Sequence, residues 1–174
     1  MKVPPITTAR LRLDPLLPET IEALLADELQ TASKLQGIAI PEDVASGLDH
    51  FFLRVQLDRM RTNPEGRGWC ARLMVDLEDG SLVGNCGFHG PPEDVGRAEI
   101  GYTVLEQHRR RGLATEAARA LLDYAATHGA AQVFASAARD NVPSLRVIEK
   151  LGFHQTGTQI DEIDGEELVF EVDL

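Results

Sequence analysis

Three consecutive arginines, followed by a glycine and small residues, form a candidate anion-binding segment, Arg109–Thr115. The first N–H groups of a helix have no partner within it, and the helix dipole favours negative charge there. Gly112 and Ala114 would let a ligand approach the backbone closely. A solvated basic turn before an ordinary helix is the alternative. The predicted phosphate-binding residues are Arg109, Arg110, Arg111, Gly112, Leu113, Ala114 and Thr115.

The segments on either side of this loop have different periods. The run Ala98–Val104 alternates apolar and polar residues, which predicts a strand. From Thr115 onward, apolar residues recur at intervals of three and four, Glu116 lies in the first turn, and Gly129 follows as a stop signal. This predicts an amphipathic helix, so the arginine loop connects a strand to a helix, the order that an anion site needs.

The loop resembles the cofactor loop of the GNAT acetyltransferases. Arg109, Gly112 and Ala114 match its pattern of Gln or Arg, two residues, Gly, one residue, and Gly or Ala. Together with further matching segments, the resemblance covers nearly the whole chain. It is strongest to the branch that acetylates N-termini of ribosomal proteins. Further matching segments are Thr8–Leu13, Glu99–Tyr102, Asn141–Ser144 and Glu149–Phe153.

This resemblance implies an acetyl-CoA-dependent N-acetyltransferase without a metal, acting by direct attack of a primary amine in a ternary complex. The acceptor would be a small amine or a protein N-terminus, including that of a ribosomal protein. Val104 would offer backbone groups to the pantetheine arm, and Asn141 would hydrogen-bond the pantetheine or the acetyl group. As bare residues, Val104 is a buried strand position and Asn141 a helix cap.

Proton transfer needs a base near the amine, because an alkylamine attacks only in its neutral form. Glu99, on the strand face opposite Ile100, is the predicted base, with a solvated strand carboxylate as the alternative reading. His89 and His108 are further candidates. The family often places a carboxylate on this strand.

The leaving thiolate gains from a nearby proton donor, and here the sequence departs from the family. Many GNAT enzymes use a tyrosine in the helix after the splayed strand, whereas the two tyrosines here are Tyr102 and Tyr124. The resemblance implies that the Ser144 hydroxyl faces the sulfur instead, unless it is merely a first-turn residue. A CoA-binding module without catalysis and a transferase of a longer acyl group therefore stay open, whereas a P-loop is disfavoured by the missing Lys-Ser/Thr ending.

Composition limits the class of protein. The 174 residues predict one domain over 1–174, and no apolar run is long enough for a membrane span. The segment Met1–Pro5 lacks the apolar core of a signal peptide, so we expect a cytoplasmic protein. The net charge of -11 argues against nucleic-acid binding and favours a cationic substrate. The oligomeric state is open, a homodimer included.

Two cysteines, Cys70 and Cys86, lie in apolar strand-like runs without metal-ligand spacing. They are interpreted as core thiols, with a catalytic cysteine as the disfavoured alternative because no histidine and acid partner is evident.

The remaining segments predict a mixed α/β domain around a largely antiparallel sheet. The order matches the GNAT fold, in which the central sheet is splayed at the acetyl-CoA site between flanking helices. Phe51 and Phe52 would belong to the acceptor wall in that family, or to the core. Expected strands are Thr8–Pro15, Trp69–Leu77, Ser81–Phe88, Gln132–Ala138, His154–Ile160 and Leu168–Val172. Expected helices are one from Pro18 through Leu29, a short piece within Leu35–Gly47, His50–Met60 and Asn141–Lys150.

Overall fold

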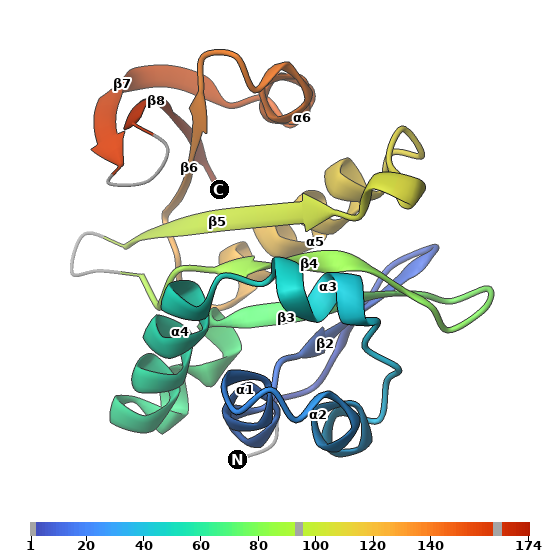
Figure 1. The fold of residues 1–174 in the computed structure, drawn as a ribbon. Helices are drawn as coiled ribbons and strands as arrows, with labels where there is room; N and C mark the ends of the chain where they lie inside the picture. The colour runs from blue at the N-terminus through green and yellow to red at the C-terminus, as the bar shows by residue number, and fades with distance from the viewer. Residues whose placement is uncertain (1–2, 93–95, 162–164) are drawn as a thin grey trace.

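The computed structural model describes residues 3–92, 96–161 and 165–174. Within these residues, eight strands form one sheet in the order β1-β2-β3-β4-β5-β6-β8-β7. Neighbouring strands are antiparallel except β5 and β6, which are parallel. The mixed α/β architecture with a largely antiparallel sheet is the one that the sequence predicts (Figure 1).

The elements follow closely the order expected from the sequence. The strands are β1 (Ile6–Thr7), β2 (Leu11–Pro15), β3 (Ala71–Asp76), β4 (Leu82–Phe88), β5 (Arg97–Val104), β6 (Gln132–Ala138), β7 (His154–Asp161) and β8 (Gly165–Asp173). The α-helices are α1 (Pro18–Leu25), α2 (Leu29–Gln36), α3 (Glu42–Gly47), α4 (His50–Thr62), α5 (Leu113–Thr127) and α6 (Val142–Lys150). Two 3-10 helices are η1 (Pro64–Trp69) and η2 (Glu106–His108).

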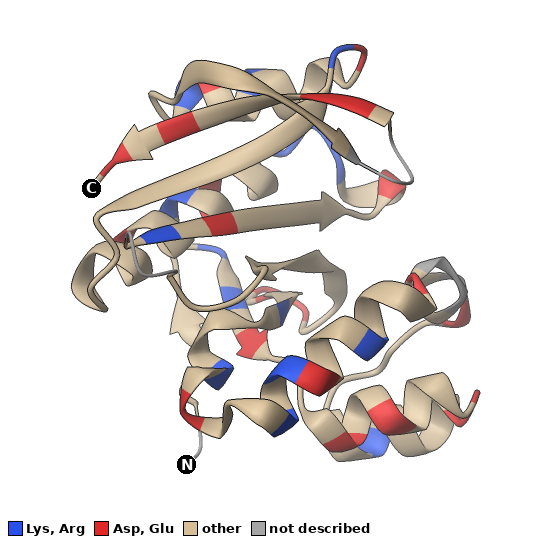
Figure 2. Ribbon diagram, turned by 90° about the vertical axis from the view of Figure 1, so that its left-hand side faces the viewer, with Lys and Arg blue, Asp and Glu red and all other residues tan. Residues whose placement is uncertain are grey.

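Both faces of the sheet are covered, so its central strands are apolar on both sides. On β3, Met74 belongs to the core cluster that includes α5, whereas Leu73 and Val75 belong to a second cluster with α1, α2 and α4. This follows from the two-residue period of a strand. Figure 1 shows α5 on one side of the sheet and α1 to α4 on the other. Figure 2 shows many of the charged residues on the helices.

The sheet opens between its two parallel strands. β5 and β6 pair only where Arg97–Glu99 faces Gln132–Phe134. Beyond that point β5 continues along β4 to Val104, while β6 continues along β8 to Ala138. The two strands therefore part at Glu99, and backbone and side chains of both lie open between them. This opening positions the candidate site.

Several expected boundaries are wrong. The helix from Pro18 ends at Leu25, and Leu29 begins a separate helix, because Asp27 has a φ of 58° that no α-helix accommodates. Trp69 ends a 3-10 helix rather than beginning β3. The long helix starts at Leu113 and not at Thr115.

The first strand is also shorter than expected. It begins at Leu11 because residues 8–10 form a turn in which the Thr8 N–H donates to the Leu11 carbonyl at 2.8 Å. The separate strand Ile6–Thr7 precedes this turn. In the described part of the chain, no helix has the length and apolar character needed to cross a membrane. The acidic turn expected around Asp164 lies outside the described residues.

Candidate active site

Two cavities lie along the opening between β5 and β6, and they differ in charge. The first, the basic cavity, has a volume of about 640 Å³ and is formed by the end of β5, the arginine loop, the start of α5 and α6. Its ionisable lining residues carry no carboxylate among them. They are His108, Arg109, Arg110, Arg146 and Lys150.

The second, the acidic cavity, has a volume of about 560 Å³ and lies between β4, β5, β6 and the segment that enters α4. Three carboxylates line it, Asp49, Glu99 and Glu167, and His89 is the basic lining residue. Leu48 and Phe52 contribute to one wall. Phe51 does not line the cavity and is exposed.

The two cavities meet. Both are lined by Tyr102, Thr103, Asn141 and Ser144, at the end of β5 and the start of α6. A molecule in the basic cavity and one in the acidic cavity would therefore touch at these four residues. This junction is where a group could pass from one to the other.

The start of α5 has the features of an anion site. Its N-cap Gly112 has a φ of 79° and no side chain caps the helix, so the first N–H groups have no partner within it. Residues 112–115 all line the basic cavity. Arg110 also has a positive φ, of 62°, a conformation that costs a non-glycine residue about 1–2 kcal/mol. Such strain is typical of binding loops.

The three arginines separate in space. Arg110 lines the basic cavity, and so does Arg109, whose Nε donates to the carbonyl oxygen of Val104 at 3.0 Å. Arg109 thus occupies one of the two acceptor positions of this carbonyl. Arg111 is not among the residues lining the cavity, and its guanidinium pairs with Asp76 at 3.0 Å.

A clamp from the N-terminal turn holds the loop. Arg10 Nε donates to Glu116 Oε2 at 2.7 Å, and Arg10 Nη1 donates to the Arg111 carbonyl at 2.9 Å. Thr8 Oγ1 donates to Glu116 Oε1 at 2.7 Å. Burial raises the pKa of Glu116, but the hydrogen bonds from Thr8 and Arg10 outweigh it and the pKa is lowered. The Thr-x-Arg opening of the sequence thus fixes the start of α5.

The predicted base Glu99 has two side-chain partners in the acidic cavity. His89 Nδ1 lies 3.1 Å from Glu99 Oε2, and the Ser136 hydroxyl donates to Glu99 Oε1 at 3.3 Å. Burial by itself raises the pKa of Glu99, yet the contacts with His89 and Ser136 lower it overall. Gly101 makes room for this arrangement, because a Cβ there would lie 2.9 Å from His89 Nε2. The structure thus joins two of the sequence-predicted base candidates in one pair.

Asn141 and Ser144 line both cavities at the junction, and Tyr102 contacts Ser144 there. Asn141 Oδ1 accepts from the Ser144 N–H at 3.2 Å, which confirms the helix cap. The Tyr102 hydroxyl donates to the Ser144 backbone carbonyl at 3.3 Å. Burial raises the pKa of Tyr102 to about 12, so this hydroxyl keeps its proton at neutral pH. The third base candidate, His108, lines the basic cavity and not the acidic one.

The cysteines fit the core-thiol interpretation. Cys70 and Cys86 are buried, and burial raises the pKa of Cys70 to about 11 and that of Cys86 to about 12. Thiols with such pKa values are poor nucleophiles at neutral pH. In the described part of the chain, no group of three or more His, Cys, Asp or Glu side chains could hold a metal ion.

Two functional candidates escaped the sequence reasoning. Tyr102 was assigned to the apolar strand face, but its hydroxyl reaches α6 across the opening of the sheet. The last strand was expected to begin at Leu168, whereas β8 begins at Gly165 and therefore includes Glu167. No local pattern identifies either, because the neighbours that make them interesting come from other strands.

Comparisons with known proteins agree with this geometry. The sequence model of the acetyltransferase (GNAT) domain matches residues 10–154. YjdG of Bacillus subtilis, named as an uncharacterized N-acetyltransferase, is 34% identical over 88 residues, which are 50% of this chain and 52% of YjdG. The chain thus matches about half the length of this curated relative.

Solved structures share the fold over nearly the full chain. A protein of Bordetella pertussis assigned to the GnaT family of acetyltransferases superposes with a TM-score of 0.68 and 25% identity, covering 97% of this chain and 99% of its own. RimL, a ribosomal L7/L12 alpha-N-protein acetyltransferase in complex with coenzyme A, has a TM-score of 0.67 and 16% identity, with 98% of both chains covered. At that identity the likeness to RimL concerns the fold alone.

Proposed function

Because the chain belongs to the GNAT acetyltransferase family, we propose that it transfers an acetyl group from acetyl-CoA to a primary amine by direct attack in a ternary complex. The observation that carries this proposal is the junction of a basic and an acidic cavity at Tyr102, Thr103, Asn141 and Ser144. Two substrates of opposite charge can lie there end to end, which direct transfer requires.

The basic cavity suits the cosubstrate. Acetyl-CoA carries phosphates, which helix N-termini bind through free N–H groups and which arginines bind by charge. Gly112, Leu113, Ala114 and Thr115 supply the helix start, and Arg109 and Arg110 the charge. The Arg109 side chain would exchange its bond to the Val104 carbonyl for the phosphates, which frees that carbonyl for the pantetheine arm.

The acidic cavity suits the amine. Its carboxylates attract a protonated amine, and Glu99 is placed to take up the proton directly or through water. At the junction, the hydroxyls of Tyr102 and Ser144 are the groups that could donate to the sulfur as charge develops on it. The proposed catalytic residues are therefore Glu99 and Ser144, with Tyr102 added.

The purified protein should release CoA from acetyl-CoA faster when a suitable amine is present. The measurement is thiol release with a panel of small amines and peptides, among them ribosomal N-terminal peptides, with mass analysis of the acetylated product. Tight acetyl-CoA binding without turnover across the panel would instead support a CoA-binding module. A longer acyl group is distinguished by replacing acetyl-CoA with propionyl- and butyryl-CoA.

A protein N-terminus is one acceptor that the comparisons favour. RimL, which shares the fold, is a ribosomal-protein acetyltransferase. The half-buried Phe52 lines the acidic cavity, and the exposed Phe51 precedes it in the sequence. A peptide could lay its first residues there while its amine reaches Glu99.

Replacing Gly112 by valine should weaken acetyl-CoA binding at least tenfold, or about 1.4 kcal/mol. The φ of 79° strains an L side chain, and a bulky group at the helix start would hold the phosphate away from the N–H groups. The measurement is calorimetric titration with acetyl-CoA.

Gly129 offers a matched control at the other end of the same helix. Its φ is 93°, and a Cβ there would meet nothing within 4 Å. Gly129→Val should thus impose a similar backbone strain and leave the affinity unchanged. Equal affinity losses in both variants would attribute the effect to helix stability and contradict a phosphate site at Gly112.

A further inference from the structure

Glu167 is a buried carboxylate without a cationic partner. The residue is 9% exposed, and its side-chain partner is an amide: Gln159 Nε2 donates to Glu167 Oε2 at 3.0 Å. Other shielded carboxylates of the sheet and its helices have cations, as Asp76 has Arg111 and Glu171 has Arg97. Among the described residues, no Lys, Arg or His forms an ion pair with Glu167. Since burying an unpaired charge is costly, this carboxylate is suited to bind a cation from outside.

The place of Glu167 relative to Glu99 follows from the strand register. Glu167 pairs with Ala138 on β6, two residues beyond Ser136, whose hydroxyl contacts Glu99. Directly paired residues and residues two apart share a face, so Ser136 and Glu167 face the same side of the sheet. One strand spacing and two residues of rise separate them by about 8 Å. The acidic cavity thus contains the Glu167 carboxylate in addition to that of Glu99.

No cationic side chain among the described lining residues of the acidic cavity pairs with Glu167. Its lining carboxylates are Asp49, Glu99 and Glu167, and its one basic lining residue, His89, is engaged with Glu99. Asp49 Oδ1 accepts from the Phe51 N–H at 2.9 Å as the cap of α4. Arg139 follows Ala138, the residue that pairs with Glu167 on β6, but its side chain binds the neighbouring Glu166 at 3.0 Å.

We infer that the acceptor carries a second cationic group, an ammonium or a guanidinium, which Glu167 binds while the reactive amine lies at Glu99. Because both carboxylates line the same cavity, the pair suits a straight-chain diamine, or a peptide N-terminus followed by a lysine or arginine side chain. This inference rests on the proposed acetyl transfer. Glu167 makes one charge-assisted hydrogen bond to the acceptor and takes no part in the proton transfer.

The test compares dicationic acceptors with matched monocationic ones. Straight-chain diamines are set against monoamines of equal length, and peptides with lysine as second residue against the same peptides with norleucine. The wild-type protein should prefer the dicationic member of each pair at least tenfold in kcat/KM. A preference limited to the peptides identifies a protein N-terminus as the source, and one limited to diamines a small molecule.

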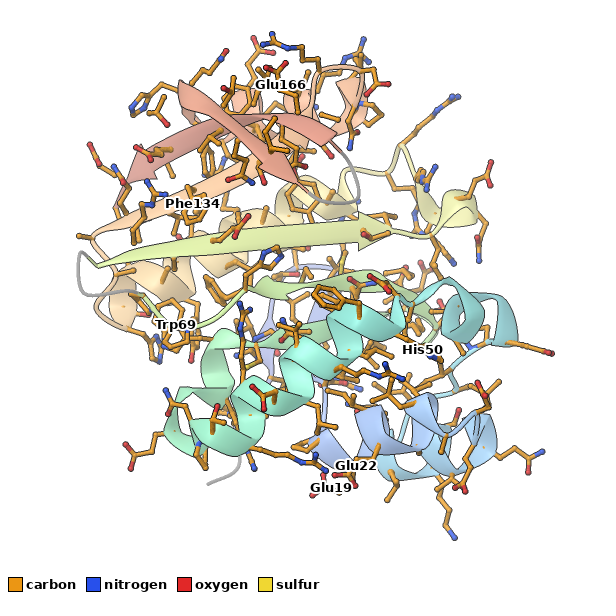
Figure 3. All side chains as sticks on the ribbon, turned by 60° about the vertical axis from the view of Figure 1, so that its left-hand side comes forward. Glu19, Glu22, His50, Trp69, Phe134 and Glu166 are labelled. Carbon is orange, nitrogen blue, oxygen red and sulfur yellow. The ribbon has the colours of Figure 1, made fainter. Side chains whose placement is uncertain are left out.

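Glu167→Gln should abolish the preference by raising KM for the dicationic acceptors at least tenfold. The KM of the monocationic acceptors, kcat and the affinity for acetyl-CoA should stay close to wild type. Glu166→Gln is the matched control, since Glu166 is exposed and paired with Arg139 outside both cavities; Figure 3 shows it beside β7 and β8. This control should change none of these values.

Calorimetric titration of a diamine into the CoA-bound protein provides a readout independent of turnover. Weaker diamine binding in Glu167→Gln, together with absent turnover for every acceptor, would refute acetyl transfer and keep the cation site. Turnover with equal KM values for both members of each pair, unchanged by Glu167→Gln, would overturn the cation site and keep acetyl transfer. An equal loss of kcat/KM in Glu167→Gln for the dicationic and the monocationic acceptor of each pair would also overturn the cation site.

Discussion

Replacing Glu99 by glutamine should lower kcat about a hundredfold and leave the Kd of acetyl-CoA unchanged. Glutamine keeps the shape of the side chain and its acceptor for the Ser136 hydroxyl, but it cannot take up a proton. Because the basic cavity does not contain Glu99, cosubstrate binding is independent of the change. Stopped-time CoA release and calorimetry measure the two quantities.

The pH dependence of this effect follows from the direction in which the pKa of Glu99 is shifted. The pKa of Glu99 is lowered from its ordinary value of 4.5, so its carboxylate remains ionised as the pH falls through the neutral range. The wild-type rate should therefore exceed the variant rate from about pH 8 to about pH 5, and the ratio of the two rates should collapse only below that.

His89 provides the competing explanation. A ratio that collapses near pH 6 would indicate a base of the imidazole type and make Glu99 its positioning residue. A double-mutant cycle with His89→Asn measures how far the two act as a unit. Glu171→Gln is the control for a carboxylate of the same sheet, because Glu171 pairs with Arg97 and lines neither cavity; full activity is expected.

The fold could be predicted from the sequence where a periodic hydrophobic pattern extends over many residues and a capping or terminating residue marks its end. The helix ending before Gly129 and the capped helix after Asn141 both have these features, and Gly129 indeed has a φ of 93°. The break at Asp27 was missed because an aspartate with positive φ leaves no mark in an apolar pattern that continues to Leu29. The end of the 3-10 helix at Trp69 was missed because Trp69 is apolar and directly precedes the apolar run of β3.

The candidate site could be predicted only where its residues are close together in the sequence. The loop from Arg109 to Thr115 forms one wall of the basic cavity, but the divergence of Arg111 toward Asp76 depends on a contact 35 positions away. The clamp of Arg10 on Glu116 spans 106 positions. Sequence spacing cannot reveal such pairs, because the sheet register and the crossover through α5 bring them together.

Tyr102 illustrates the same limit at the reacting centre. A two-residue period assigns its face of the strand, but not the direction of its hydroxyl once β5 and β6 part. In the structure the hydroxyl reaches the start of α6, the helix in which the sequence lacks a tyrosine. The missing helix tyrosine therefore does not leave the junction without a phenol.

Replacing Tyr102 by phenylalanine should lower kcat about a hundredfold, because removing one preorganised donor near developing negative charge typically costs that much. With a pKa raised to about 12, the Tyr102 hydroxyl keeps its proton, and we expect it to exchange its bond to the Ser144 carbonyl for a hydrogen bond to the developing thiolate. Phenylalanine retains the ring that packs on the core cluster beside α5. The Kd of acetyl-CoA should change little, so the loss appears in kcat.

Ser144→Ala should lower kcat about tenfold or less, because no hydrogen bond within the described residues fixes the Ser144 hydroxyl, whereas the Tyr102 hydroxyl is held by the Ser144 carbonyl. Tyr124→Phe is the matched control: Tyr124 packs against Trp69 at 5.5 Å between ring centroids and lines neither cavity. Kinetics of CoA release with one good acceptor compare the three variants. A larger loss in Ser144→Ala than in Tyr102→Phe would make the serine the donor to sulfur and leave Tyr102 as a residue that only positions α6.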